Sequence, residues 1–125
     1  MQILITNSSD KPLYQQIGDQ IRQAIFRGEL QADDPLPSIR ALASDLGVSV
    51  LTVRHVYDEL EEQGFVQSRA GRGTFVAAGN LELLREAKRR QVEQRLAQLV
   101  DLARELGVTR QELGEMLDIL YEQAG

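Results

Sequence analysis

The 125-residue chain has no cysteine, one histidine and only three prolines. The absence of cysteine excludes disulfides, thiolate metal sites and a thiol nucleophile. The lone His55 has no partner for a metal site or a catalytic triad. No apolar run reaches the roughly 18 residues that span a membrane, and the first residues lack the basic start and apolar stretch of a signal peptide. We therefore expect a soluble cytoplasmic protein with no metal, no cofactor and no membrane contact.

The chain is also short of positive charge. Its net charge is −5, and division after Ala78 leaves a net charge of −3 before the division and −2 after it. Neither part has the basic excess that is typical of nucleic-acid-binding proteins. Binding to DNA would therefore depend on a few arginines that gather on one surface.

Three helices are predicted in the first half of the chain. Apolar residues at four-residue steps predict a helix over 12–27, preceded at 3–5 by either a short strand or a buried arm. Ser38 and Ser49 are expected to be N-caps of two further helices, because a serine hydroxyl accepts a hydrogen bond from a free amide. The glycine-containing turn between these two helices is typical of a helix-turn-helix. The buried face of the third helix is expected to be Val53, Val56, Tyr57 and Leu60.

A β-hairpin is predicted after the third helix. Residues 65–69 and 74–76 are prone to form strands, and 70–73 form a turn between them. Residues 29–37, with two aspartates and two prolines, are expected to be a loop. Three helices followed by a hairpin are the parts of a winged helix. We therefore predict a mainly α fold with a small β-hairpin, a winged helix-turn-helix over 1–78.

Residues 79–125 are predicted to form a two-helix C-terminal hairpin. From about 80 to 106 no glycine or proline interrupts the chain, which gives a helix roughly 40 Å long. Thr109 and Glu112 have the spacing of a capping box at the start of a last helix. That helix, over about 109–123, is expected to bury Leu113, Met116, Leu117, Leu120 and Tyr121.

The apolar residues of the tail follow the alternating steps of four and three that mark a coiled-coil seam. A hairpin of this size cannot bury its whole apolar stripe alone, so we expect it to form a homodimer. The alternative is that the tail packs on its own winged helix-turn-helix domain. The residues expected at the dimer interface are Val92, Leu96, Leu99, Ala103, Leu106, Leu113, Leu117 and Leu120.

Five short segments together carry a family resemblance. They read LPSIR (36–40), LGVS (46–49), TVR (52–54), LEEQG (60–64) and GRGTFV (71–76). Their order and spacing resemble the DNA-binding domain of the GntR family of bacterial regulators. The opening PLYQQI and the short two-helix tail are similar to the YtrA subfamily in particular. The resemblance implies a transcription regulator, usually a repressor, that dimerises through its tail on an inverted-repeat operator in double-stranded DNA.

The third helix is expected to lie in the major groove, where the N-terminal residues of a recognition helix meet base edges. Arg54 is the best candidate to read guanine, although arginine also serves as a phosphate clamp. The resemblance implies a DNA contact for Arg40, and Arg72 in the wing is expected to enter the minor groove. The full set of candidate DNA-binding residues is Ser38, Arg40, Ser49, Leu51, Thr52, Arg54, His55, Arg69, Gly71, Arg72 and Gly73.

Several of these residues have simpler alternatives. Arg40 can be a solvated arginine or pair with Asp45, and the wing can be an ordinary hairpin with a solvated tip. His55 is either a donor that faces the groove or a bystander. The sequence also departs from the family at Val50 and Leu51, where a basic and a small polar residue are common. These apolar side chains can at most contact a thymine methyl group.

Other functions are weaker interpretations. The acidic balance suits a winged helix that docks proteins, and the wing also leaves RNA binding open. An enzyme is disfavoured, because the sequence has no phosphate-binding glycine loop, no metal-ligand spacing and no nucleophile beside a base. A tail this small offers little volume for a pocket. Any small-molecule effector is therefore expected at the dimer interface or between the domain and the tail.

Overall fold

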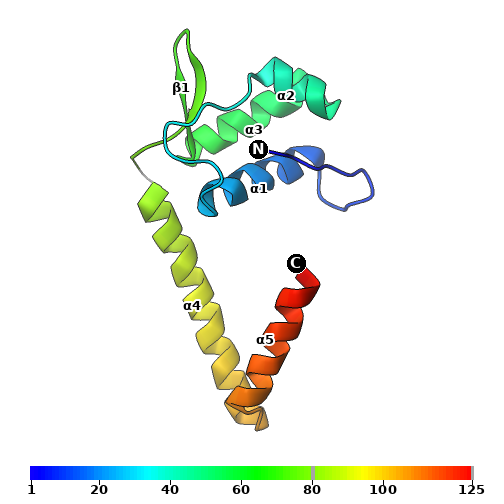
Figure 1. Ribbon diagram of the computed structural model, residues 1–125, viewed down its shortest axis with the longest axis vertical. Helices are drawn as coiled ribbons and strands as arrows, with labels where there is room; N and C mark the ends of the chain where they lie inside the picture. The colour runs from blue at the N-terminus through cyan, green and yellow to red at the C-terminus, as the bar shows by residue number, and fades with distance from the viewer. Residues whose placement is uncertain (80, 125) are drawn as a thin grey trace. The chain divides into compact units, whose positions relative to one another are not determined.

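The computed structural model describes residues 1–79 and 81–124; Asn80, at the predicted junction, and Gly125 lie outside the described residues. The chain divides into two compact units, Met1–Arg85 and Glu86–Gly125. The elements (Figure 1) follow one another as α1 (Leu13–Phe26), α2 (Ile39–Leu46), α3 (Val50–Glu62), β1 (Val66–Arg69), β2 (Gly73–Val76), α4 (Leu81–Leu106) and α5 (Arg110–Ala124). The predicted winged helix-turn-helix with a two-helix tail is confirmed.

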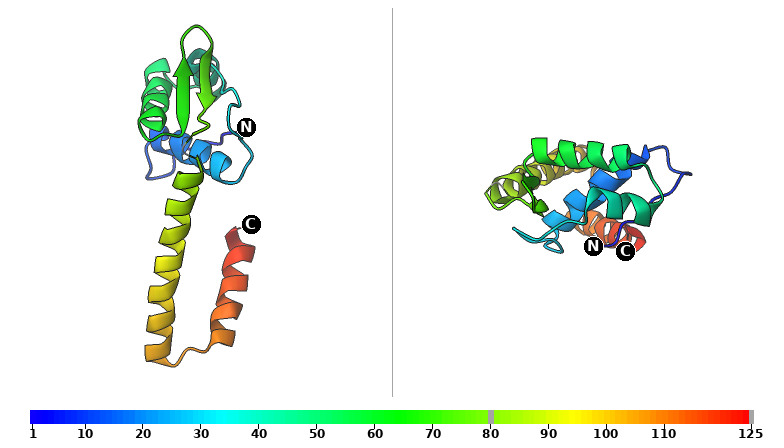
Figure 2. Two further views of the ribbon diagram at one scale, coloured as in Figure 1. Left: turned by 90° about the vertical axis from the view of Figure 1, so that its left-hand side faces the viewer. Right: turned by 90° about the horizontal axis from the view of Figure 1, so that it is seen from above.

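The first unit is built around one apolar core. The stripe on α1 supplies Ile17, Ile21 and Ile25, each at most 1% exposed. The buried face of α3 consists of the four residues that the sequence predicts. The hairpin of β1 and β2, which stands beside the helices in Figure 2, closes the core with buried apolar side chains. These hairpin and adjoining residues are Phe65, Val66 and Val76.

The first unit extends further along the chain than the predicted division after Ala78. Leu81 and Leu84, in the first turn of α4, pack against the core. The Arg85 guanidinium donates to the carbonyl oxygen of Ile25 at 3.3 Å and forms an ion pair with Glu82 at 3.0 Å. The start of α4 is therefore part of the first compact unit because its apolar residues complete that core.

The segment before α2 pairs with the hairpin, although the sequence suggests only a loop. Asp33 N donates to Val76 O at 2.9 Å, and Val76 N donates to Asp34 O at 2.8 Å. Leu36 N donates to Thr74 O at 2.9 Å. Asp33 has a φ of 68°, a conformation that aspartate tolerates better than most residues. This segment therefore runs along β2 and connects the wing to the start of α2.

The first residues form a docked arm and not a strand. Ile3 and Ile5 pack, partly buried, against the core. Gln16 on α1 accepts a hydrogen bond from Thr6 N at 2.9 Å, while its Nε2 donates to Thr6 O at 2.9 Å and to Lys11 O at 2.8 Å. Gln20, one turn later, exchanges the same pair of bonds with the backbone of Leu4. The two glutamine side chains thus satisfy backbone hydrogen-bonding groups of the arm, as a neighbouring β-strand would.

The second unit is a helical hairpin with its turn at Gly107. Thr109 Oγ1 accepts from Glu112 N at 3.1 Å, which confirms the predicted N-cap. The Glu112 carboxylate accepts a hydrogen bond from the Thr109 hydroxyl at 3.1 Å. Glu112 therefore binds the side chain of Thr109, whereas in a full capping box it would bind the backbone amide of Thr109.

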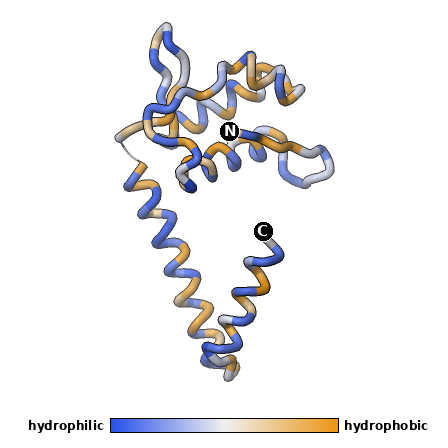
Figure 3. The backbone as a smooth tube through the Cα atoms, in the orientation of Figure 1, coloured by the Kyte–Doolittle hydropathy of each residue, from blue (hydrophilic) through white to orange (hydrophobic). Residues whose placement is uncertain are grey.

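Most apolar residues of the tail are exposed in the single chain. The prediction that α5 buries Met116, Leu117, Leu120 and Tyr121 is wrong for the isolated chain, because these side chains are 48–74% exposed. The two helices of this unit diverge from their turn (Figure 1), and apolar residues along both of them are exposed. Of the expected interface residues, only Ala103 is buried and Leu113 is half-buried. The apolar residues along both helices appear orange in Figure 3.

None of the helices within residues 1–79 and 81–124 is both long and apolar enough to cross a membrane.

We expect Gln16→Ala to lower the free energy of unfolding by about 1–3 kcal/mol, because the buried amide satisfies three backbone groups of the arm. The measurement is urea unfolding followed by circular dichroism. Gln23→Ala, at an exposed position of the same helix, is the matched control. Equal unfolding midpoints for the two variants would contradict this role of Gln16.

Candidate nucleic-acid interface

Both helices of the helix-turn-helix begin at a serine cap. Ser38 Oγ accepts from Ala41 N at 3.1 Å, and Ser49 Oγ accepts from Thr52 N at 3.0 Å. Ser49 Oγ also lies 2.7 Å from Thr52 Oγ1. Each cap orients the first turn of its helix, whose free amides form a ready site for an anion such as a DNA phosphate. The cap predictions are confirmed, and their role toward DNA stays a prediction.

Tyr57 fixes α3 against the segment that leads into α2. Its hydroxyl donates to Pro37 O at 2.7 Å, directly before the Ser38 cap. Burial raises the pKa of Tyr57 well above its usual value, so the group remains a neutral donor. Helical spacing predicts that Tyr57 is in the core but does not predict this bond. The tyrosine hydroxyl itself indicates such a bond, since a buried tyrosine hydroxyl usually finds a hydrogen-bond partner.

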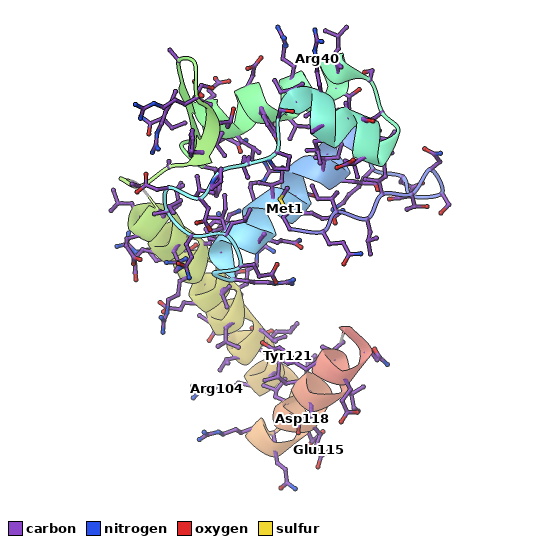
Figure 4. The ribbon with its side chains drawn as sticks, turned by 45° about the horizontal axis from the view of Figure 1, so that its top comes forward. Met1, Arg40, Arg104, Glu115, Asp118 and Tyr121 are labelled. Atoms are coloured by element: carbon purple, nitrogen blue, oxygen red, sulfur yellow. The ribbon has the colours of Figure 1, made fainter. Side chains whose placement is uncertain are left out.

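A groove brings together three arginines from separate elements. Arg40 lies in the first turn of α2, Arg54 in α3, and Arg72 in the turn between β1 and β2; all three are exposed. The Arg40 side chain extends into solvent (Figure 4). The groove has a volume of about 470 Å³. It is lined by Leu36, Ser38, Ile39, Arg40, Val50, Arg54, Arg72, Gly73 and Thr74.

The wing reaches the groove because two glycines shape its turn. Gly71 and Gly73 have φ values of 71° and 108°, which side chains other than glycine rarely adopt. Arg72 N donates to Arg69 O at 2.9 Å across the turn. The register pairs Arg69 with Gly73, so Gly73 begins β2 and does not end the turn as expected. Arg72 is thus placed at the tip, next to the residues of α2 and α3 that line the groove.

The outward face of α3 begins with two exposed apolar residues, Val50 and Leu51, which together we call the apolar crest. Leu51 is 75% exposed, Arg54 and His55 are exposed, and Thr52 is half-buried. His55 Nε2 lies 3.7 Å from Glu59 Oε2, and its ring packs edge-on against Tyr14 with centroids 4.8 Å apart. His55 thus contacts Glu59 on its own helix and Tyr14 on α1, and these contacts orient its ring.

Arg69 lies outside the groove. Its guanidinium pairs with the Asp33 carboxylate at 2.5 Å and stacks over the Phe75 ring, 4.3 Å from its centroid. These contacts tie β1 to the segment that runs along β2. Of the candidate arginines, the structure therefore brings Arg40, Arg54 and Arg72 together and gives Arg69 a structural partner.

The acids at the far end of α3 are partly committed to internal bonds. Glu61 Oε2 accepts from Ser68 N at 2.7 Å, and Glu59 Oε1 accepts from Gln63 Nε2 at 3.2 Å. Asp58 and Glu62 are exposed. The groove residues include none of these acids, so the positive charge of the three arginines is concentrated on that surface.

Residues 13–76 match the model of the bacterial regulatory proteins of the gntR family. The chain belongs to the gntR family. This gntR-family chain is 39% identical to the uncharacterized HTH-type transcriptional regulator YhcF of Bacillus subtilis, over 91% of this chain and 93% of YhcF. It is 33% identical to the HTH-type transcriptional repressor YtrA of the same organism, over 92% of this chain and 88% of YtrA.

Solved structures show the same fold. A transcriptional regulator from Oenococcus oeni matches with a TM-score of 0.70 and 26% identity, over 94% of this chain and 97% of that one. The AraR DNA-binding domain in complex with the operator ORX1 matches with a TM-score of 0.55 and 31% identity, over 62% of this chain and 96% of that one. The gntR-family chain is thus a transcription regulator of the YtrA-like type, and its relatives are regulators and not enzymes.

We expect Tyr57→Phe to lower the free energy of unfolding by about 1 kcal/mol at neutral pH, because the bond to Pro37 is lost. Tyrosine in an unfolded chain ionises near pH 10, whereas the raised pKa of Tyr57 keeps the folded state protonated. The contribution of Tyr57 is therefore complete below about pH 10 and is lost as the pH rises toward its folded pKa.

The measurement is urea unfolding of the wild type and of Tyr57→Phe between about pH 8 and 11. The stability of the wild type should fall more steeply than that of the variant at the alkaline end. Tyr121→Phe, at an exposed position, serves as the control. Parallel curves for the wild type and Tyr57→Phe would show that the hydroxyl does not resist ionisation.

Proposed function

We propose that this gntR-family regulator represses transcription as a homodimer on an inverted-repeat operator. In this proposal α3 lies in the major groove and the wing contacts the adjacent minor groove. Arg54 reads a base edge, while Arg40 and Arg72 contact the DNA backbone or the minor groove. The tail, from Glu86 onward, joins the two copies.

The observation that carries the proposal is the groove with three arginines. Arg40, Arg54 and Arg72 come from α2, α3 and the wing, and they line one surface of an otherwise acidic protein. Phosphate oxygens prefer arginine because its planar guanidinium forms paired hydrogen bonds. The serine-capped helix starts add oriented amides to this surface. This arrangement of positive charge suits double-stranded DNA, because phosphates flank the major groove that α3 would enter.

The relatives support the same function. AraR, whose DNA-binding domain has this fold, is described in complex with operator DNA, and YtrA is named a repressor. Binding to operator DNA also implies that the protein works in the cytoplasm, where a bacterial chromosome lies.

The exposed apolar residues of the tail support the homodimer. Val92, Leu96, Leu99 and Leu106 are 47–70% exposed along one helix. Their spacing fits the seam of a coiled coil, and exposed apolar patches of this kind mark interaction sites. A two-fold dimer also places two recognition helices about 34–36 Å apart, one turn of DNA, as two half-sites require.

The test of the proposal is in-vitro selection from random duplex DNA at moderate salt. Enrichment of an inverted repeat would establish specific binding and two-fold symmetry together. The absence of any binding would contradict the proposal and would favour a protein-docking role.

Substitution of the groove arginines should weaken binding to the selected operator. Arg40→Ala and Arg72→Ala are expected to reduce affinity on all sequences and to lower the slope of log K against log salt by about 1 for each lost phosphate contact. Arg54→Ala should cost about 1–3 kcal/mol and relax preference at one base pair. Titration by fluorescence anisotropy at several salt concentrations measures both effects. Arg27→Ala, at the end of α1, is the control, and an equal loss for Arg27→Ala would argue against the groove.

Leu99→Asp is expected to produce monomers, because it places a charge among the exposed apolar residues of α4. Light scattering should then give the mass of one chain, 14.0 kDa, where the wild type gives twice that mass. Gln98→Asp, at the neighbouring exposed position, should remain dimeric. An unchanged mass for Leu99→Asp would reject this placement of the interface.

A further inference from the structure

The first turn of α3 carries two exposed apolar residues, Val50 and Leu51. Their exposed fractions are 40% and 75%, whereas the other apolar residues of α3 are buried in the core. A single exposed leucine is ordinary on a protein surface. Two adjacent exposed apolar residues at the N-terminal end of a recognition helix call for an explanation, because that end meets base edges in the major groove.

Val50 and Leu51 lie next to the arginine groove on one side and an apolar hollow on the other. Val50 lines the groove together with Arg40, Arg54 and Arg72. Leu51 lines a shallow hollow with Leu13, Tyr14, Thr52 and His55. The apolar crest is thus continuous with the surface that carries the positive charge. A partner that binds Val50 and Leu51 must therefore combine an apolar group with nearby negative charge.

Duplex DNA offers that combination at thymine. In the major groove the C5 methyl of thymine is an apolar group on the edge of the base pairs, and apolar side chains recognise it. An apolar protein partner would cover the crest but would leave the arginines beside it without counter-charge. We propose that Leu51, with Val50 beside it, reads the operator by packing on thymine methyl groups. This inference rests on the proposed function.

The spacing of Leu51 and Arg54 predicts which bases they read. Three residues along a helix correspond to a rise of about 4.5 Å, and neighbouring base pairs are about 3.4 Å apart. With α3 lying along the major groove, as proposed, this rise places Leu51 and Arg54 over neighbouring base pairs. Because Arg54 is suited to the O6 and N7 atoms of guanine, each half-site should contain a thymine next to a guanine.

The test removes the methyl group from the DNA and leaves the protein unchanged. Each thymine of the selected operator is replaced in turn by deoxyuridine, which lacks only the C5 methyl group, and Kd is measured by anisotropy. Loss of one buried methyl contact should weaken binding about fourfold. Replacement at the symmetric positions of both half-sites should weaken it about 15-fold. The effect should be confined to the thymine beside the guanine that Arg54 reads.

Leu51→Ala assigns the effect to its residue. This variant should lose most of the discrimination between the thymine and deoxyuridine operators, while Leu4→Ala, at an equally exposed leucine of the arm, should keep the wild-type discrimination. Val50→Ala should reduce the discrimination in part. Both Leu51 and Val50 are on the surface, and matching circular dichroism spectra and Tm values confirm that the variants fold.

Three results would overturn the inference. Equal Kd values for thymine and deoxyuridine at every position, with specific binding intact, would reject methyl reading and leave the proposed function standing. Discrimination that is undiminished in both Leu51→Ala and Val50→Ala would assign the methyl contact to another residue. A change of mass in Leu51→Ala would show that a second copy of the chain covers the crest. Failure of the wild type to bind any duplex would instead reject the proposed function itself.

Discussion

The placement of the interface depends on the pairing between residues 33–36 and β2. Three backbone hydrogen bonds hold this segment beside the wing, and the Tyr57 hydroxyl holds the next residue, Pro37, to α3. The start of α2, the first turns of α3 and the tip of the wing are thereby fixed relative to one another. These bonds, together with the shared apolar core, bring Arg40, Arg54 and Arg72 to one groove.

Local features of the fold were predictable from the sequence, and long-range pairings were not. The caps at Ser38 and Ser49 and the buried face of α3 follow from residue type and helical spacing, so their prediction is confirmed. The pairing of Asp33 and Leu36 with β2 joins residues about 40 positions apart, and no local pattern encodes it. For the same reason no local pattern predicts that Asp33 and Phe75 hold Arg69, and its role as a DNA contact stays a prediction. Burial on α5 was overestimated because spacing shows that a face is apolar but not what covers it.

The acidic composition is compatible with the groove because several acids are used inside the first unit. Asp33 neutralises Arg69, and Glu61 accepts a hydrogen bond from the backbone amide of Ser68 in β1. Glu59 accepts from Gln63 and lies beside His55. The groove arginines are exposed, and no acid is among the residues that line the groove. A negative total charge therefore coexists with a positive surface, which explains why totals along the sequence were a poor guide to function.

This charge arrangement has a consequence for how the proposed regulator would find its operator. Affinity for any duplex rises with the number of phosphates that a protein neutralises, and three arginines per copy are few. Non-specific binding would then be weak, and the competing sites of a genome would retain less of the protein. Specific binding would depend on contacts that add across two half-sites, so the exposed stripe of the tail and the apolar crest of α3 would act on the same equilibrium. In this proposal the tail would double the number of contacts, and thymine reading by Val50 and Leu51 would make binding at each half-site depend on the base sequence.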